Sequence, residues 1–397
     1  MRFRVAVLVV CATALVAAAG AGTAAAGAAR HSVPSAAATW AQATAAGLPD
    51  DADIGLVRGT NGVLHVIWTN GTLGSVAAYD TPIQPGGAVG QPVVITAHLN
   101  QATFPDATGW AGELHAFWNE ISNAGNKFTG TAVATWPAGG SHWDPVTGVT
   151  PALNDFWGFG VAASTGADGK PWVAFTDEGG FEVLHFGHAK RQINVSACCV
   201  YNPGIGVDDS TAATWLTWYS NITGQTGIYA QQLTQNGSKV GAAIRLPGSE
   251  TGGNAIQPNQ RTTATGLGPG KPGVYVSYLR GYPSPSQIDV IRLGSRAPVV
   301  AGTLTGGASG TTLAADPAGR LWVAWYRSTS GHSALFVRRA AAAASQFGAV
   351  QRVPLPPGTA DLWKAYINAQ AGRLDVLALL TVHGKIAYWA TQVLPPS

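Results

Sequence analysis

One short strand-like pattern occurs seven times along the 397-residue sequence, and it constrains the fold more than any other feature. Each copy begins with a small or turn residue and continues with alternating apolar residues; six positions after its start, six copies have an aromatic residue and the seventh has alanine. The copies cover residues 62–68, 112–118, 169–175, 212–218, 272–278, 319–325 and 372–378. Successive copies end 43 to 60 positions apart. Self-similarity at a period near 50 residues, in segments of β character, predicts a β-propeller.

Each repeat unit can hold four strands, as a propeller blade requires. The third unit divides into expected strands at residues 160–164, 172–175, 181–186 and 192–198, and the sixth at 311–315, 321–325, 334–338 and 350–354. Apolar residues occupy both faces of the second strand, which is expected of a sheet packed between two neighbouring sheets. We therefore expect the repeated aromatic residues to pack between blades: Trp68, Trp118, Phe175, Trp218, Tyr278 and Trp325.

The two ends of the repeat region predict how the ring closes. The seventh unit ends after its third strand, residues 386–393, and lacks a fourth. Residues 38–48 resemble the fourth-strand segment of the second unit, residues 141–151, so the N-terminal segment can complete the last blade. Such pairing covers an otherwise open sheet edge. The expected fold is all-β: a seven-bladed β-propeller closed by an N-terminal strand, with residues 31–397 forming a single domain of seven four-stranded repeats.

The first thirty residues are expected to be a cleaved signal peptide. Arg2 and Arg4 precede an apolar stretch over residues 5–19, and an Ala-x-Ala site follows at residues 24–26. The apolar stretch is shorter than the roughly 20 residues of a membrane span. Cys11 lies inside it, where a lipid-attachment cysteine would not stand. We expect a secreted, extracellular product with no membrane anchor after cleavage.

Composition excludes several function classes. Only 11% of residues are charged and 51 are glycine, which suits many short strands joined by tight turns. The formal net charge is +3 and the arginines are scattered, so nucleic acid is a poor candidate partner. The sequence has no nucleophile elbow, zinc-protease motif, phosphate-binding loop or calcium loop. We expect no cofactor, no metal site and a monomer.

Once the signal peptide is removed, only two cysteines remain, Cys198 and Cys199, adjacent in the chain. In an oxidising compartment they can form a disulfide between neighbouring residues that stiffens one loop. They can equally be two buried thiols at a strand end. Both interpretations remain open.

The turn-then-tryptophan signature resembles the repeats of secreted sialidase-like propellers, the BNR-repeat group, from Asp53 to about Gln392. That family's Asp-box, Ser-x-Asp-x-Gly-x-x-Trp, is not found, because the segment at residues 164–172 has a different spacing and is expected to join a first strand to a second. The Phe-Arg-Ile-Pro element and an arginine triad are not found either. The resemblance therefore implies the blades, not sialidase activity.

In such propellers, ligands usually bind the face that gathers two kinds of loop, those from a fourth strand to the next first strand and those from a second to a third. The candidate ligand-binding residues are Asn154, Trp157, Tyr201, Asn259, Arg261, Arg280, Arg327 and Trp363. Aromatic rings that cover the apolar face of a sugar, with amides and arginines that bond its hydroxyls, would form a glycan-binding surface. The alternative is that these are ordinary turn residues.

A glycosidase needs two carboxyl groups about 5–9.5 Å apart. Glu120, Asp155 and Glu178 are the candidate catalytic carboxylates, since neighbouring blades can bring Asp155 near either glutamate. A polysaccharide lyase would instead need a tyrosine or histidine base beside an arginine, for which Tyr201, His98 and Arg261 are available.

The histidines form no ligand signature. His65 and His115 hold equivalent places in second strands, where a structural role is expected. His185 and His188 lie three positions apart, a spacing that on a strand directs the side chains to opposite faces.

Three functional hypotheses follow. The first is a secreted binding propeller that recognises glycans or another extracellular ligand, including a protein, through its loop-rich face without catalysis. The second is a carbohydrate-active enzyme, either a glycoside hydrolase or a polysaccharide lyase, on the same scaffold. The third is a structural or adhesion module. One propeller scaffold hosts many functions, so the fold alone does not choose among them.

Overall fold

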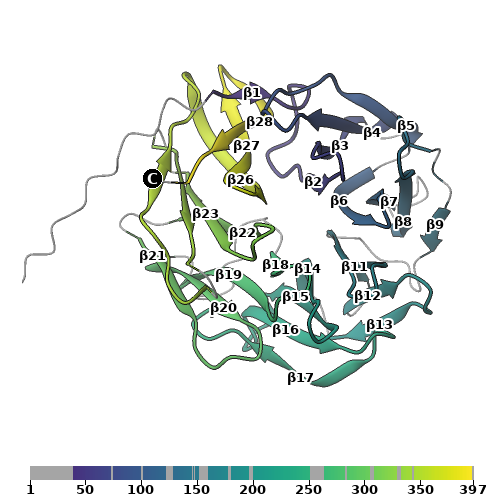
Figure 1. Cartoon of the computed structure of the whole chain (residues 1–397), viewed down its shortest axis with the longest axis vertical. Coiled ribbons are helices and arrows are strands. Elements are labelled where there is room, and N and C mark those ends of the chain that lie inside the picture. The colour runs from purple at the N-terminus through teal and green to yellow at the C-terminus, as the bar shows by residue number, and fades with distance from the viewer. Residues whose placement is uncertain are drawn as a thin grey trace, which may run out of the picture. The chain divides into compact units, whose positions relative to one another are not determined.

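The computed structural model describes residues 39–395 apart from 73–74, 100–101, 122–127, 145, 147, 152–159, 178–179, 196–199, 251–262, 282–283, 305–307, 329–331 and 342–343. All described residues belong to one compact unit, Ser32–Ser397. Among them, seven four-stranded antiparallel sheets are arranged as a ring, which Figure 1 shows in a view down its axis. The protein is a seven-bladed β-propeller, as the repeat predicts.

The first three blades contain twelve strands. Blade 1 consists of β2 (Gly55–Arg58), β3 (Leu64–Thr72), β4 (Ser75–Ile83) and β5 (Val93–Leu99). Blade 2 consists of β6 (Ala102–Trp110), β7 (Glu113–Ile121), β8 (Phe128–Trp136) and β9 (Gly148–Pro151). Blade 3 consists of β10 (Val161–Thr165), β11 (Pro171–Asp177), β12 (Gly180–His185) and β13 (Arg191–Asn194).

The next three blades repeat this order. Blade 4 consists of β14 (Val200–Asp208), β15 (Ala213–Ser220), β16 (Gly227–Leu233) and β17 (Lys239–Arg245). Blade 5 consists of β18 (Ala264–Gly266), β19 (Val274–Arg280), β20 (Gln287–Arg292) and β21 (Val299–Thr303). Blade 6 consists of β22 (Gly310–Ala315), β23 (Leu321–Arg327), β24 (Ala334–Arg339) and β25 (Gln351–Val353).

Blade 7 is completed by the N-terminal segment, which confirms the predicted closure. Its sheet has the order β1-β28-β27-β26, with β1 (Ala41–Gln42), β28 (Lys385–Val393), β27 (Arg373–Val382) and β26 (Thr359–Gln370). Ala41 lies opposite Ala390 in antiparallel register. The Ala43 amide donates to the Tyr388 carbonyl at 2.8 Å, and the amides of Gly47 and Leu48 donate to the Ile386 carbonyl. β1 lies beside β28 at the top of Figure 1.

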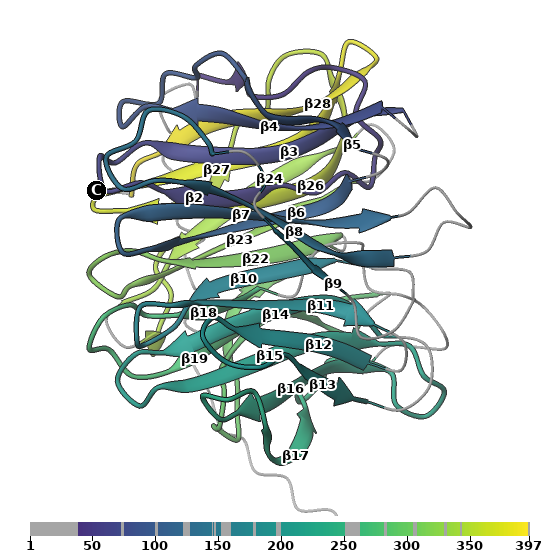
Figure 2. The ribbon, with the colours of Figure 1, turned by 90° about the vertical axis from the view of Figure 1, so that its right-hand side faces the viewer.

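The core lies between blades. Each second strand is covered on both faces, so the aromatic residues predicted to pack there are buried, with at most 5% of their surface exposed: Trp68, Trp118, Phe175, Trp218, Tyr278 and Trp325. Phe181 of blade 3 packs against Trp218 of blade 4 with ring centroids 5.6 Å apart. Figure 2 shows the ring from the side, with the strands running along the axis that Figure 1 looks down. The first strand of each blade is innermost and faces the axis.

Two expectations need correction. The fourth strand of blade 3 ends at Asn194 and not at residue 198, and Cys198 and Cys199 lie outside the described residues. The prediction that His185 and His188 face opposite sides is wrong, because β12 ends at His185 and the chain turns. The His188 amide donates to the His185 carbonyl at 2.9 Å, and the two rings stack with centroids 4.8 Å apart.

His65 and His115 are buried, in agreement with a structural role. His65 Nδ1 lies 2.6 Å from Asp80 Oδ2, which also accepts a hydrogen bond from Trp143 Nε1 of blade 2. None of the described residues forms a helix long and apolar enough to cross a membrane.

Candidate functional site

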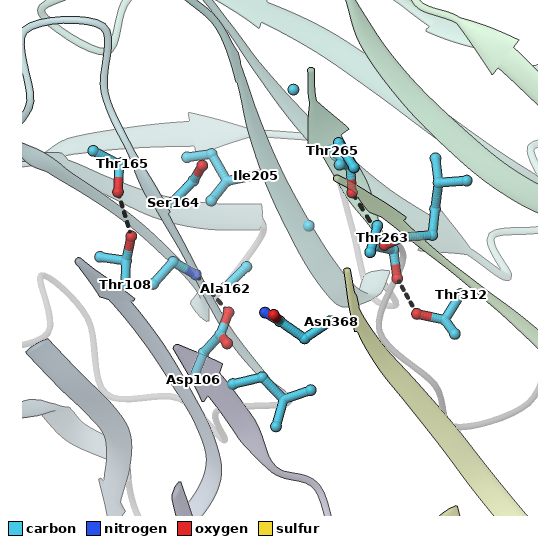
Figure 3. Close-up of a pocket in the computed structure, with 18 of the residues that line it drawn as sticks. Asp106, Thr108, Ala162, Ser164, Thr165, Ile205, Thr263, Thr265, Thr312 and Asn368 are labelled. Carbon is cyan, nitrogen blue, oxygen red and sulfur yellow. Dashed lines mark hydrogen bonds between the residues drawn. The ribbon is translucent and has the colours of Figure 1, made fainter. Parts of the chain in front are cut away.

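The innermost strands surround a cavity of about 400 Å³ on the axis of the ring. All seven blades contribute to its lining, through β2, β6, β10, β14, β18, β22 and β26 or the residues beside them. Figure 3 shows this cavity and the side chains that reach into it. Its volume falls within the roughly 300–1,000 Å³ range of small-molecule pockets.

Hydroxyl groups form much of the polar lining: Thr108, Ser164, Thr165, Thr263, Thr265 and Thr312. Alternate residues of a strand share a face, so pairs such as 263 and 265 point to the axis together. Hydrogen bonds tie neighbouring blades at this level. The Thr108 and Thr165 hydroxyls are 2.8 Å apart between blades 2 and 3, and the Thr265 hydroxyl donates to the Leu313 carbonyl at 3.2 Å.

Asn368 presents a donor to the cavity. Its Oδ1 accepts hydrogen bonds from Arg58 Nε at 3.1 Å and from Arg58 Nη2 at 2.8 Å. The Arg58 guanidinium also pairs with the buried Asp375 carboxylate at 2.5 Å, which fixes its position. Because the amide oxygen is occupied on both sides by Arg58, the amide NH₂ of Asn368 is the group left to donate to a ligand.

Asp106, on β6 of blade 2, supplies an acceptor to the same cavity. The β6 backbone shifts register between Thr103 and Asp106, and Asp106 Oδ2 accepts a hydrogen bond from the Ala163 amide at 2.7 Å. That bond crosses from blade 2 to blade 3. Figure 3 shows Asp106 and Asn368 both reaching into the same space. A carboxylate and an amide donor fixed by their own partners form a rigid polar pair.

A second carboxyl group, Asp209, lines the cavity where β14 turns into β15. Burial raises the pKa of Asp209, and the neighbouring Asp208 carboxylate raises it further. Asp208 behaves in the opposite way. Burial would raise its pKa, but hydrogen bonds from Ser210 and from the Gly273 amide outweigh burial and hold the pKa below its usual value. Asp209 is therefore the carboxyl of this pair that holds a proton more readily.

The structure places only some of the residues predicted to form a site. Asn154, Asp155, Trp157, Glu178, Asn259 and Arg261 lie outside the described residues, so their placement stays a prediction. His98 lies on β5, at a position whose side chain is not described. The described candidates are Glu120, Tyr201, Arg280, Arg327 and Trp363, and none of these five is among the residues that line the cavity.

Tyr201 and Trp363 lie in strands and not in loops, because β14 and β26 begin earlier than the repeat pattern indicates. Tyr201 packs against the apolar cluster between blades 4 and 5. Trp363 keeps 36% of its surface exposed, and its Nε1 donates to the Thr381 hydroxyl at 2.9 Å. Its indole is therefore the one among these candidates that offers an exposed ring.

Arg280 ends β19 and pairs with Asp289, whose side chain is fully buried. Arg280 Nε and Nη2 lie 2.7 and 2.6 Å from Asp289 Oδ2. This guanidinium is engaged by the protein itself. Arg327 ends β23 and is half-buried.

Glu120 lies on β7 and is half-buried. Burial raises its pKa. Among the described residues no group of three or more His, Cys, Asp or Glu side chains could hold a metal ion.

The fold and the cavity together define a seven-bladed β-propeller with a polar central channel. No protein-family model matches the chain, and no curated protein matches it. Solved structures share the fold. An ulvan lyase, a polysaccharide lyase bound to -[GlcA(1-4)Rha3S]-, superposes with a TM-score of 0.56 at 11% identity, over 87% of this chain and 94% of that one.

Two further similarities have the same character. A streptogramin B lyase gives a TM-score of 0.51 at 13% identity, over 90% of this chain and 98% of that one. The endosialidase of phage phi92 gives 0.51 at 9% identity, over 91% of this chain and 69% of that one. At such identities the similarity is one of fold alone, so a function has to be inferred from the residues of the channel.

Proposed function

We propose that the protein is a secreted propeller that binds a glycan in its central channel. The observation that supports this most is the lining itself: six hydroxyl groups, the Asn368 amide donor and the Asp106 carboxylate surround about 400 Å³. Each hydroxyl of a sugar both donates and accepts hydrogen bonds. Threonine and serine hydroxyls can also donate or accept, so they can pair with it in either direction. Apolar positions between them, such as Ile205 and Ile367, can cover the less polar faces of a sugar ring.

The polar pair also favours binding because it is held in place before a ligand arrives. Asn368 is fixed through Arg58, and Arg58 through Asp375. Asp106 is fixed through the Ala163 amide. A ligand that enters such a site does not have to order these side chains, so less of its binding free energy is lost.

The test is a glycan-array screen with the mature protein, followed by calorimetry on any sugar that binds. The decisive variant is Asn368→Asp, which keeps an oxygen for Arg58 and replaces the donor facing the channel with an acceptor. We expect about tenfold weaker binding, the usual worth of one hydrogen bond to a polar ligand. The matched control is Asn194→Asp, the same substitution at an exposed position on β13.

Ser164→Ala is a second variant, since it removes one hydroxyl of the lining without adding charge. It should weaken binding of the same sugar and leave the melting temperature of the protein unchanged. If the Asn368→Asp and Asn194→Asp variants bind the sugar with equal affinity, the sugar does not bind in the channel. If no sugar on the array binds, the glycan hypothesis is wrong.

A carbohydrate-active enzyme is the second candidate function. One observation favours it: Asp209 lines the channel and burial raises its pKa, and a general acid needs a carboxyl that stays protonated near its working pH. Reducing-end and unsaturated-uronate assays on the sugars that bind would detect hydrolysis or elimination. Asp209→Asn should abolish any such activity; activity that survives this substitution would remove Asp209 from the mechanism.

A further inference from the structure

A second cavity lies between blades 5 and 6, away from the channel. It encloses about 500 Å³ and is formed by the turns between the first and second strands of both blades, together with the connections between their third and fourth strands. Its lining includes Leu267, Lys271, Tyr275, Val290, Arg292 and Ala297. It shares no residue with the lining of the channel.

The floor of this cleft is apolar. Leu267, Tyr275, Val290 and Ala344 are each at most 7% exposed and belong to one buried cluster that joins the two blades. Burial raises the pKa of the Tyr275 hydroxyl, which therefore stays protonated at neutral pH and can donate a hydrogen bond. The floor thus offers an apolar surface with one hydroxyl.

The rim carries two cations. Lys271 stands in the turn before β19, and Arg292 ends β20. Two glycines make room for them: a Cβ at Gly319 would collide with the Lys271 side chain, and one at Gly273 would lie 2.7 Å from Arg292 Nε. Gly319 has φ +74°, so the turn there favours glycine for its backbone as well.

These two charges are not balanced within the cleft. Its lining contains no aspartate or glutamate. In the part of the chain that the structure describes, neither Lys271 nor Arg292 takes part in an ion pair. The nearby carboxylates have other partners: Asp208 accepts the Gly273 amide at 2.7 Å, and Asp316 pairs with Arg339 at 2.7 Å.

We propose that the cleft is a binding site for an organic anion, a carboxylate or sulfate group carried on a ring with an apolar face. The anionic group lies between Lys271 and Arg292, and the ring rests on Leu267, Tyr275 and Val290. A lone inorganic anion would leave the apolar floor uncovered, and a neutral ring would leave both cations without a partner. The chemistry of floor and rim together selects a molecule that has both parts.

Such an anion can come from an aromatic acid or from an acidic sugar, and the probes separate these sources. Calorimetry and ligand-observed NMR would be run with benzoate, D-glucuronate and inorganic sulfate, and with benzyl alcohol as the neutral analogue of benzoate. We expect benzoate or glucuronate to bind at least about tenfold more tightly than sulfate and benzyl alcohol, since only they satisfy both floor and rim. The tighter of the two identifies the source.

Two variants locate the binding. The double variant Lys271→Gln/Arg292→Gln should bind the organic anion about tenfold or more weakly than the parent protein. Ala297→Trp, at an exposed position of the lining, should block the cleft by volume alone. Arg352→Gln removes an exposed arginine of β25 outside the cleft and is the matched control for charge.

The outcomes are distinct from those for the channel. Asn368→Asp should leave anion binding unchanged, and the cleft variants should leave sugar binding in the channel unchanged. The proposal is overturned if neither organic anion binds at millimolar concentration, if benzyl alcohol binds as tightly as benzoate, or if the double variant binds as the Arg352→Gln control does.

Discussion

The Lys364 ammonium lies 2.9 Å from the Asp53 carboxylate, and both side chains are buried where the last blade meets the first. Lys364 also donates to the Asp51 carbonyl, and the Tyr366 hydroxyl donates to Asp53. This network fastens blade 7 to the segment that leads into blade 1. It therefore acts at the seam where the ring closes.

Removing one partner of this pair should be strongly destabilising. Lys364→Met leaves Asp53 buried without its cation, and we expect a loss of about 3–5 kcal/mol in the free energy of unfolding. Denaturant unfolding measures it. Asp53→Asn in the Lys364→Met background should recover part of the loss, and Lys385→Met, at an exposed position, serves as the control. A loss below about 1 kcal/mol for Lys364→Met would contradict the proposed importance of the seam.

The closure by β1 predicts the effect of removing it. Deletion of residues 38–48 leaves β28 with an unpaired edge and exposes the apolar surface that Ala43 and Leu48 cover. We expect a loss of at least about 3 kcal/mol, since it combines several hydrogen bonds with apolar burial, and a tendency to associate through the open edge. Thermal melts and size-exclusion chromatography would show both effects.

A point substitution tests the same strand more gently. Ala43→Pro removes the amide that donates to Tyr388, whereas Ala46→Pro alters an exposed position whose amide has no such part in the pairing. Ala43→Pro should lower the melting temperature clearly and Ala46→Pro little. An unchanged melting transition after both the deletion and Ala43→Pro would mean that the closure contributes nothing to stability.

Asp208 should make the ring sensitive to acid. Its pKa is lower in the folded protein than in the unfolded chain, so the folded state binds fewer protons, and the carboxylate stabilises the fold above the ordinary pKa of about 3.9. That contribution is lost as the pH falls from about 4 through the lowered folded value. The Asp208→Asn variant should be less stable than the parent protein at pH 7. Its free energy of unfolding should also fall less steeply below pH 4. Asp50→Asn, at an exposed position, should keep the slope of the parent protein.

Arg280 separates a structural role from a ligand-binding one. Because it pairs with the buried Asp289, Arg280→Met should reduce stability by about 1–3 kcal/mol, less than a fully buried pair because the guanidinium is partly exposed. Sugar affinity should stay unchanged. A large loss of affinity in a variant whose melting temperature is unaltered would restore Arg280 as a ligand contact.

The sequence predicts the blades well because each one repeats a local signal. The turn and the alternating apolar residues of the second strand recur seven times, and the buried aromatic residue recurs in six of these copies. A missing fourth strand at one end matches a spare strand at the other. The alternation of strand side chains does not extend to His188, because the chain turns after His185. Nothing local marks that turn other than Gly187, whose φ is +89°.

The channel is harder to find from the sequence because its residues meet only when the ring closes. Arg58 and Asn368, which together orient the donor in the channel, are 310 positions apart. First strands carry small residues and isolated threonines, which are unremarkable one at a time. Aligning the first strands of the units would have revealed one inward position, opposite the fourth residue of the repeat, that holds a polar side chain in four blades: Thr108, Ser164, Thr265 and Asn368. That is the signal that could have found the site.

The pairing of Ala41 with Ala390 also orders events during synthesis. The strand that emerges first has no partner until β28, at the other end of the repeats, has been made. Six blades can form from neighbouring segments as the chain lengthens, whereas the seventh needs both ends at once. A chain that stops before residue 385 would carry both an unpaired N-terminal strand and an incomplete last blade. Such a chain could not close the ring.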